Sequence, residues 1–253
     1  MTDAAPAFKD HFSRHAGAYA RYRPDYPAAL FAWLAEVAPN TNRAWDCATG
    51  NGQAAVALAG HFARVDATDA SEPQVRSARP HPRVEYRVAP AERSGLEDAS
   101  IDLITVAQAL HWFDLPAFYA EAGRVLVPGG VLAVWAYALF NATEEIDAVV
   151  TRLYRDIVGP YWPPDRKVIE TGYAGIELPF ERVEAPPFRM EKRWTADDAA
   201  GYLGTWSATR GYIDAHGHDP VALVADDLAA AWGPGERTVR WPLILLVSRK
   251  PSG

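Results

Sequence analysis

The sequence contains almost no cysteine, no apolar run of membrane length and no excess of basic side chains. Cys47 is the only cysteine among 253 residues, which rules out an intramolecular disulfide. A secreted fold held by disulfides is therefore excluded, and we expect a reducing, cytoplasmic location. The longest apolar stretches, such as residues 129–140, are too short to cross a bilayer. Residues 1–15 lack the apolar segment of a signal peptide, so we expect no membrane partner.

Acidic residues outnumber basic ones, 32 to 25, and the formal charge is −7. Domains that bind duplex nucleic acid usually present a basic face, so we expect no nucleic-acid partner. Apolar residues make up 49% of the chain and charged residues 23%, as is typical of a globular domain. The length is sufficient for one α/β domain with a substantial core.

Between residues 28 and 137, apolar strand-forming segments alternate with helix-forming segments. Helices are expected at 28–37, 53–62, 71–79 and 115–126. Strands are expected at 43–48, 63–69, 83–89, 100–108 and 130–137. Ser71 is expected to cap the third of these helices. The alternation predicts a parallel sheet that helices cover on both faces.

The alternation stops after residue 140. We expect helices at 143–159, 195–213 and 219–232, a strand at 180–194 that Pro186 and Pro187 interrupt, and a last strand at 237–250. Pro242 cannot donate a backbone hydrogen bond, so it predicts a bulge or an unpaired side in the last strand. At the other end of the chain, residues 8–22 have helical spacing of apolar side chains.

A glycine-rich corner, WDCATGNGQAA at residues 45–55, joins the first expected strand of the sheet to the next helix. In an open parallel sheet, ligands bind outside the carboxyl ends of the strands. Gly50 and Gly52 allow positive φ and let a ligand lie on the backbone. Asp69 ends the next strand, where a carboxylate can accept both hydroxyls of a ribose. A structural tight turn is the alternative for the glycines alone, but the whole arrangement predicts a nucleoside-type cofactor.

The carboxylate of Asp46, just before this corner, bears on which cofactor binds. GNGQAA also fits the dinucleotide fingerprint G-x-G-x-x-A, so an NAD-type oxidoreductase is one alternative. Asp46 would repel a pyrophosphate and attract the ammonium of an amino acid, which favours a sulfonium amino-acid nucleoside. A non-catalytic protein that retains the cofactor fold is the second alternative.

Five segments in chain order, WDCATGNGQ, VDATDAS, APAE, SIDLITVAQALHWFD and RVLVPGGVLAVW, resemble the motifs of class I S-adenosylmethionine-dependent methyltransferases. YARYRPDYP, YWPPDR and YLGTWSATR are similar to the small-molecule branch that includes trans-aconitate methyltransferase, the methyltransferase type 11-like group. The resemblance covers nearly the whole chain. It departs from the family pattern at Ala48, where the family usually has its first glycine.

The resemblance implies an α/β fold with a doubly wound, mostly parallel seven-stranded sheet and an antiparallel C-terminal strand. It implies a single methyltransferase domain over residues 1–253, divided into an N-terminal helical lid (1–26), a cofactor-binding core (27–140), an insertion with substrate-pocket elements (141–235) and the last strand (236–253). We expect a monomer or a homodimer that acts on a small molecule.

The resemblance also implies S-adenosyl-L-methionine as cofactor and S-adenosyl-L-homocysteine as product. Asp46 and the corner after it would hold the methionine part, Asp69 the ribose, and Ala91 with Glu92 the adenine. The full set of expected cofactor-binding residues is Tyr22, Arg23, Asp46, Cys47, Ala48, Thr49, Gly50, Asn51, Gly52, Gln53, Asp69, Ala70, Ser71, Ala91, Glu92, Gln108, Ala109 and Leu110.

Methyl transfer from such a cofactor is a direct displacement, so the protein mainly supplies alignment and excludes water. A protonated oxygen acceptor needs a base, and His111 is the candidate catalytic residue, with packing beside Trp112 as the alternative. His111, Trp112, Tyr161 and Trp206 are the expected substrate contacts, although aromatic side chains here could instead fill the core of the insertion.

Two arginines, Arg23 and Arg210, are candidates to clamp a substrate carboxylate, with a surface role as the alternative. We expect no metal site, because the histidine pairs lack matching carboxylate or cysteine ligands.

Overall fold

The computed structural model describes residue 22 and residues 24–253. Most of the expected N-terminal lid, residues 1–21, and Arg23 lie outside these described residues. Tyr22 is described, and its ring lies against Gly201, where a Cβ would overlap it.

The first half of the described chain forms the predicted alternation of strands and helices. Its elements are α2 (Ala28–Val37), β1 (Arg43–Cys47), α3 (Gln53–Leu58), β2 (Arg64–Asp69), α4 (Glu72–Arg76), β3 (Val84–Val88), β4 (Ile101–Ala107), the 3-10 helix η1 (Leu110–Trp112), α5 (Leu115–Val125) and β5 (Leu126–Tyr137). Strands β1 to β5 pair in parallel, in the order β3-β2-β1-β4-β5. The predicted fold class, a mostly parallel sheet with an antiparallel C-terminal strand, is confirmed.

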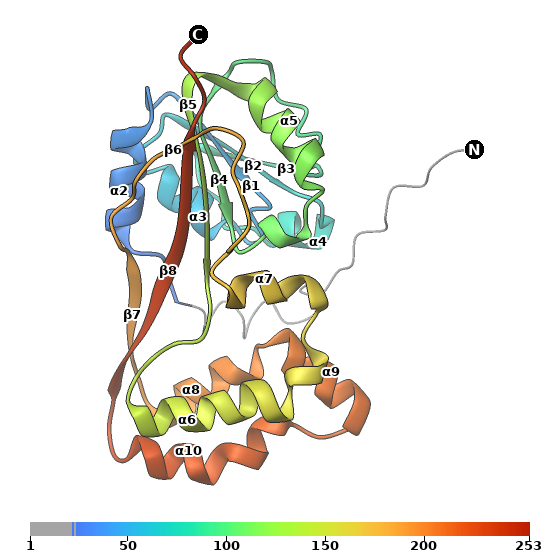
Figure 1. Ribbon diagram of the computed structural model, residues 1–253, viewed down its shortest axis with the longest axis vertical. Helices are drawn as coiled ribbons and strands as arrows, with labels where there is room; N and C mark the ends of the chain where they lie inside the picture. The colour runs from blue at the N-terminus through green and yellow to red at the C-terminus, as the bar shows by residue number, and fades with distance from the viewer. Residues whose placement is uncertain (1–21, 23) are drawn as a thin grey trace, which may run out of the picture.

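Helices cover both faces of the sheet, as Figure 1 shows for α2 on one side and α5 on the other. On one face, Leu30 and Leu34 of α2 and Leu58 of α3 pack with side chains of β1, β2, β4 and β5. On the other face, Phe118 and Val125 of α5 pack with the alternate side chains of β1, β4 and β5. The near-continuous burial of β4 and β5 follows from this double cover, because alternate residues face a helix layer on either side.

The second half of the chain supplies a separate group of helices. They are α6 (Glu144–Arg152), the π-helix η2 (Leu153–Ile157), the 3-10 helices η3 (Gly159–Tyr161) and η4 (Pro164–Arg166), α7 (Lys167–Glu170), α8 (Ala196–Gly204), α9 (Ser207–His216), the 3-10 helix η5 (Pro220–Val224) and α10 (Ala225–Trp232). We call α6, η2, η3, α8, α9, η5 and α10, with the residues that directly flank them, the cap. Figure 1 shows the cap beyond the lower end of the sheet, with α7 between the two. Tyr137, the last residue of β5, packs in the cap's own core, so the cap lies at the carboxyl end of that strand.

Three strands complete the sheet: β6 (Glu181–Arg182), β7 (Arg189–Trp194) and β8 (Arg237–Arg249). Pro186 and Pro187 divide the expected strand at 180–194 into β6 and β7, so the described sheet has eight strands instead of seven. Both β6 and β7 lie within residues 141–235. Pro242 lies where β8 changes partner: residues 243–249 pair with β5, and residues 237–242 pair with β7.

Candidate functional site

The backbone of the glycine-rich corner takes the left-handed conformation at three positions. The φ angles are 55° at Ala48, 57° at Gly50 and 82° at Gly52. A Cβ at Gly50 would meet no described atom within 4 Å, so the backbone there borders open space. A Cβ at Gly52 would overlap the phenol of Tyr86, which therefore supports the corner from behind. The two glycines thus serve different purposes, since one leaves room for a ligand and the other permits packing.

Ala48 replaces the glycine that the family pattern has at this position, yet it keeps a positive φ. For a residue with a Cβ, this conformation costs roughly 1–2 kcal/mol. The strain lies directly beside Asp46, in the turn that Thr49 anchors by donating its backbone N–H to the Thr68 carbonyl at 2.9 Å. Strained backbone that the surrounding structure holds in place is common at ligand sites.

Asp46 is a buried carboxylate, with 1% of its surface exposed. It accepts hydrogen bonds from the hydroxyls of Thr49 at 2.5 Å and Thr105 at 2.7 Å, and from the backbone of Ala55. No cation of the described residues forms an ion pair with it. Burial is the main cause that raises the pKa of Asp46 from 3.8 to about 6. The folded protein therefore keeps a charge here that its own residues stabilise incompletely.

Asp69 joins the glycine-rich corner to the turn after β2. Its two carboxylate oxygens accept the backbone N–H of Gly50 and of Ser71, each at 2.8 Å. Ser71 caps α4 as predicted, accepting the N–H of Gln74 at 3.4 Å. These two bonds hold the carboxylate of Asp69 between the corner after β1 and the turn after β2.

Cys47 lies among three acidic side chains. Burial raises the pKa of its thiol well above the usual value, and the charges of Asp46, Glu92 and Asp69 raise it further. The thiol is therefore held in its protonated form and is a poor nucleophile. Asp46 lies near the end of β1, Asp69 ends β2 and Glu92 lies in the loop after β3, so all three carboxylates follow the carboxyl ends of parallel strands.

The remaining expected cofactor residues come from segments that the sheet brings together. Cys47, Ala91, Ala109 and Leu110 belong to one apolar cluster, against which Ala48 and Trp112 pack. Gln108, with φ 58°, donates its side-chain amide to the Tyr137 carbonyl at 3.0 Å. Glu92 accepts the N–H of Asp114 at 3.1 Å, and the Asn51 carbonyl accepts the N–H of Arg79 at 3.0 Å. Ala70 is exposed.

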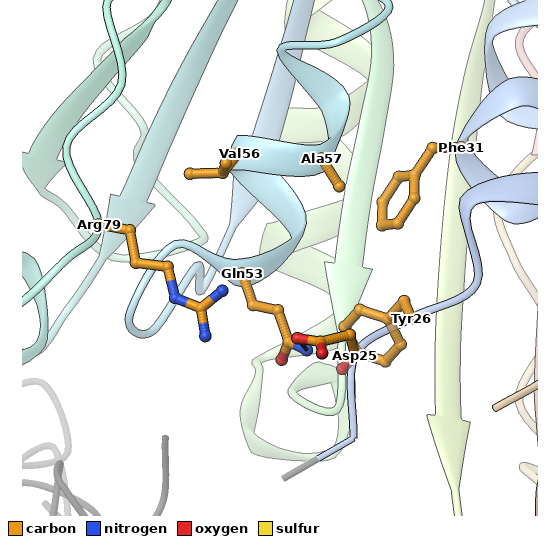
Figure 2. Close-up of a pocket in the computed structure, with 7 residues that line it drawn as sticks. All are labelled: Asp25, Tyr26, Phe31, Gln53, Val56, Ala57 and Arg79. Atoms are coloured by element: carbon orange, nitrogen blue, oxygen red, sulfur yellow. Dashed lines mark hydrogen bonds between the residues drawn. The ribbon is translucent and has the colours of Figure 1, made fainter. Parts of the chain in front are cut away.

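Gln53 starts α3 and faces away from this cluster, toward the segment before α2. Its side-chain amide donates to the Pro24 carbonyl at 2.9 Å and to Asp25 at 3.2 Å. Gln53 lines a pocket of about 170 Å³. Figure 2 shows Tyr26 and Phe31 on one side of Gln53 and Arg79 on the other. Small-molecule sites usually measure about 300–1,000 Å³, so this pocket is small for a nucleoside cofactor.

His111 lies on η1, directly after β4. Its Nδ1 is 3.5 Å from the hydroxyl of Tyr173, and its ring centroid is 4.7 Å from that of Trp112. Burial, and then the charge of Arg166, lowers the pKa of His111 from 6.5 to about 4. The imidazole is therefore neutral near neutral pH. The packing beside Trp112, given above as the alternative, is present, and the role of His111 as base or substrate contact stays a prediction.

Tyr173 and Arg166 lie near His111, although neither was among the expected site residues. Tyr173 is 2% exposed and has φ 59°, an unusual backbone for an aromatic residue. The sequence did contain a signal for this unusual backbone, because Gly172 and Gly175 flank Tyr173 in TGYAG. Both glycines have positive φ in the structure.

The other expected substrate residues lie in the cap. Trp206 is 3% exposed and packs in the cap's core between Tyr154 and Tyr202. Tyr161 lies at the cap surface, where its hydroxyl is 2.6 Å from His216 Nε2. Arg210 pairs with Asp214 on α9 at 3.1 Å, which is the surface role given as its alternative.

No group of three His, Cys, Asp or Glu side chains in residues 22 and 24–253 is arranged to hold a metal ion. No helix in that part of the chain has both the length and the apolar character needed to cross a membrane.

The strand order, the antiparallel last strand β8, the acid before a glycine-rich corner after β1 and the acid at the end of β2 together define a class I methyltransferase fold. Comparison with known proteins agrees with this class. A family model described as a methyltransferase domain matches residues 45–134. A protein of Dictyostelium discoideum, named as a candidate methyltransferase, is 33% identical over 99% of this chain and its own full length. The chain therefore belongs to the methyltransferase family.

Two further relatives are similar over most of the chain. The solved structure of a candidate type II methyltransferase from Anaeromyxobacter dehalogenans is 48% identical, has a TM-score of 0.86, and covers 91% of this chain and 99% of its own. An uncharacterised methyltransferase of Mycobacterium tuberculosis is 36% identical over 73% of this chain and 70% of its own length. The resemblance to trans-aconitate methyltransferase has no counterpart among these relatives.

Proposed function

We propose that this protein transfers a methyl group from S-adenosyl-L-methionine to an oxygen of a small organic acceptor. The observation that carries the proposal is Asp46, a buried carboxylate without a cationic partner in the described chain, beside the open backbone of Gly50. The ammonium and sulfonium of this cofactor would supply the missing positive charge. A dinucleotide would instead bring a pyrophosphate toward Asp46, Asp69 and Glu92, and no finding favours that alternative.

The residues at the strand ends fit the parts of the cofactor. Asp46 and the backbone of residues 47–53 would hold the amino-acid part, and the carboxylate of Asp69, at the end of β2, would accept the ribose hydroxyls. Ala91 and Glu92 would border the adenine. S-adenosyl-L-methionine supplies an already activated methyl group when bound, so the chain contributes alignment and exclusion of water. In model reactions such alignment is worth about 7–11 kcal/mol.

On the acceptor side, His111 would face the substrate as a neutral imidazole. A pKa of about 4 makes it a weak base near neutral pH, because base catalysis is most effective when the pKa lies near the working pH. We therefore favour His111 as a hydrogen-bonding contact that orients the acceptor. An acceptor oxygen that is already ionised would need no base.

Calorimetric titration tests the cofactor assignment. We expect S-adenosyl-L-homocysteine to bind and NAD to give no heat, and we expect a cell extract with isotopically labelled methyl donor to yield products of increased mass. At a hundredfold excess over its Kd, the homocysteine form should stabilise the fold by about 2.7 kcal/mol. Binding of NAD in its place would refute the proposal, and cofactor binding without any methylated product would favour a non-catalytic role.

A further inference from the structure

A partly buried cation lies on the cap side of the site. Arg166 ends η4, which packs against η1, the short helix that carries His111. Its guanidinium carbon lies 4.0 Å from the ring centroid of Trp162, and Nη1 donates to the Tyr154 hydroxyl at 2.6 Å. Within residues 22 and 24–253, Arg166 forms no ion pair with a carboxylate. Glu170 lies nearby but accepts its hydrogen bond from Tyr154, at 2.5 Å.

The charge of Arg166 reaches the side chains around the acceptor position. Together with burial it lowers the pKa of His111, and it partly offsets the effect of burial, which raises the pKa of Tyr154 and of Tyr173. A guanidinium has five N–H donors, and the described structure uses one of them on Tyr154. Most of its hydrogen-bonding capacity therefore remains for a ligand.

The charges of the site are separated by position. Three carboxylates, Asp46, Asp69 and Glu92, act on Cys47 at the cofactor side. Arg166 is the cation that acts on His111, at the acceptor side. An anionic acceptor would be attracted to Arg166 and repelled by the three acids. The electrostatic field of these side chains would therefore orient the acceptor.

We propose that Arg166 binds a carboxylate of the acceptor and thereby makes this site selective for acidic substrates. This inference rests on the proposed methyl transfer. Where that carboxylate is also the nucleophile, one of its oxygens forms a bond to the methyl carbon as the carbon–sulfur bond breaks, and the electron pair of that bond stays on sulfur. No proton has to be removed, which agrees with a neutral, weakly basic His111.

Tyr154 and Glu170 act as positioning residues for this arginine. Tyr154 is 6% exposed. Its hydroxyl donates a hydrogen bond to Glu170, so the hydroxyl oxygen presents a lone pair to Arg166. Trp162 supports the guanidinium from its face, which is a favourable cation–π arrangement. These contacts fix the planar group so that little freedom is lost when a carboxylate binds.

The test measures binding of matched acids and amides to the enzyme saturated with S-adenosyl-L-homocysteine. The probes are benzoate, hexanoate and tricarballylate, each compared by calorimetry with its amide. We expect at least one acid to bind about tenfold or more tightly than its amide, as for hydrogen bonds to charged groups. Arg166→Gln should remove this preference. Lys167→Gln, which removes the neighbouring exposed charge, should retain it.

Two further variants separate positioning from folding. Tyr154→Phe should reduce the acid-to-amide preference several-fold, while the Kd for S-adenosyl-L-homocysteine stays unchanged. Arg166→Lys should keep part of the preference that Arg166→Gln loses. The inference is overturned if no acid binds better than its amide, or if Arg166→Gln keeps the preference. Failure of the wild-type protein to bind S-adenosyl-L-homocysteine would instead overturn the proposed function, so the two failures are distinguishable.

Discussion

Replacing Asp46 with asparagine should stabilise the ligand-free protein near neutral pH. The pKa of the buried carboxyl is about 6 when folded, compared with an ordinary value of 3.8. Between these values the folded state holds a proton that the unfolded state has released, so stability falls as the pH rises. This rise in the pKa corresponds to about 3 kcal/mol of stability, which the wild type loses progressively as the pH rises from below 3.8 to above about 6. Asparagine carries no such charge and can still bond to Thr49 and Thr105, because both hydroxyls can rotate.

The assay is urea unfolding of the wild type and Asp46→Asn at several values between pH 4 and pH 8. We expect the free energy of unfolding of the variant, relative to the wild type, to rise by about 2.5 kcal/mol from pH 4 to pH 8. Other titrating groups are common to both proteins and cancel in the difference. The variant should also bind S-adenosyl-L-homocysteine about tenfold or more weakly, because the ammonium loses its charged acceptor.

Asp66→Asn provides a control of opposite sign. Burial opposes ionisation of Asp66, but the hydrogen bond from Arg43 and the charges of Arg64 and Arg87 hold its pKa below the usual value. The wild-type protein should therefore become more stable relative to Asp66→Asn as the pH rises through the acid range. A difference curve for Asp46→Asn that is flat, or that slopes like the Asp66→Asn curve, would refute the reasoning about Asp46.

Three other changes test the corner. Ala48→Gly should stabilise the fold by about 0.5–1 kcal/mol in urea unfolding, because relief of the positive φ exceeds the entropy cost of glycine; Ala57→Gly inside α3 should instead cost about 1 kcal/mol, and equal effects of the two would contradict the strain. Asp69→Ala should weaken S-adenosyl-L-homocysteine binding by about tenfold to a hundredfold in calorimetry, since the ribose loses a charged acceptor, and an unchanged Kd would remove Asp69 from the site. Gly52→Ala should lower stability by more than 1 kcal/mol, because φ is 82° and the new methyl meets Tyr86; thermal unfolding that matches wild type would show that Tyr86 moves aside at little cost.

The sequence by itself determined the core of the sheet and the positions of its key acids. The alternation of apolar strands with helices predicted β1 to β5, and the bounds expected for α2, 28–37, are those observed. The sequence pointed to Asp46, Gly50 and Asp69 because the formation of a strand, and of the turn that follows it, depends on residues only a few positions apart. The two prolines at 186 and 187 likewise marked a break in a strand, although not that the break would give an eighth strand to the sheet.

Only the tertiary structure decided which distant side chains surround His111. Tyr173 meets His111 across 62 positions of sequence, and Arg166 reaches the same helix from η4. No local pattern encodes such pairs, because they result from packing a whole cap against the ends of the strands. The aromatic residues of the cap look alike in sequence, yet Trp206 is placed in its core, Tyr161 at its surface and Trp162 against a guanidinium. Which aromatic face becomes buried depends on the total apolar area that the fold removes from water, a property of the assembled chain and not of any segment.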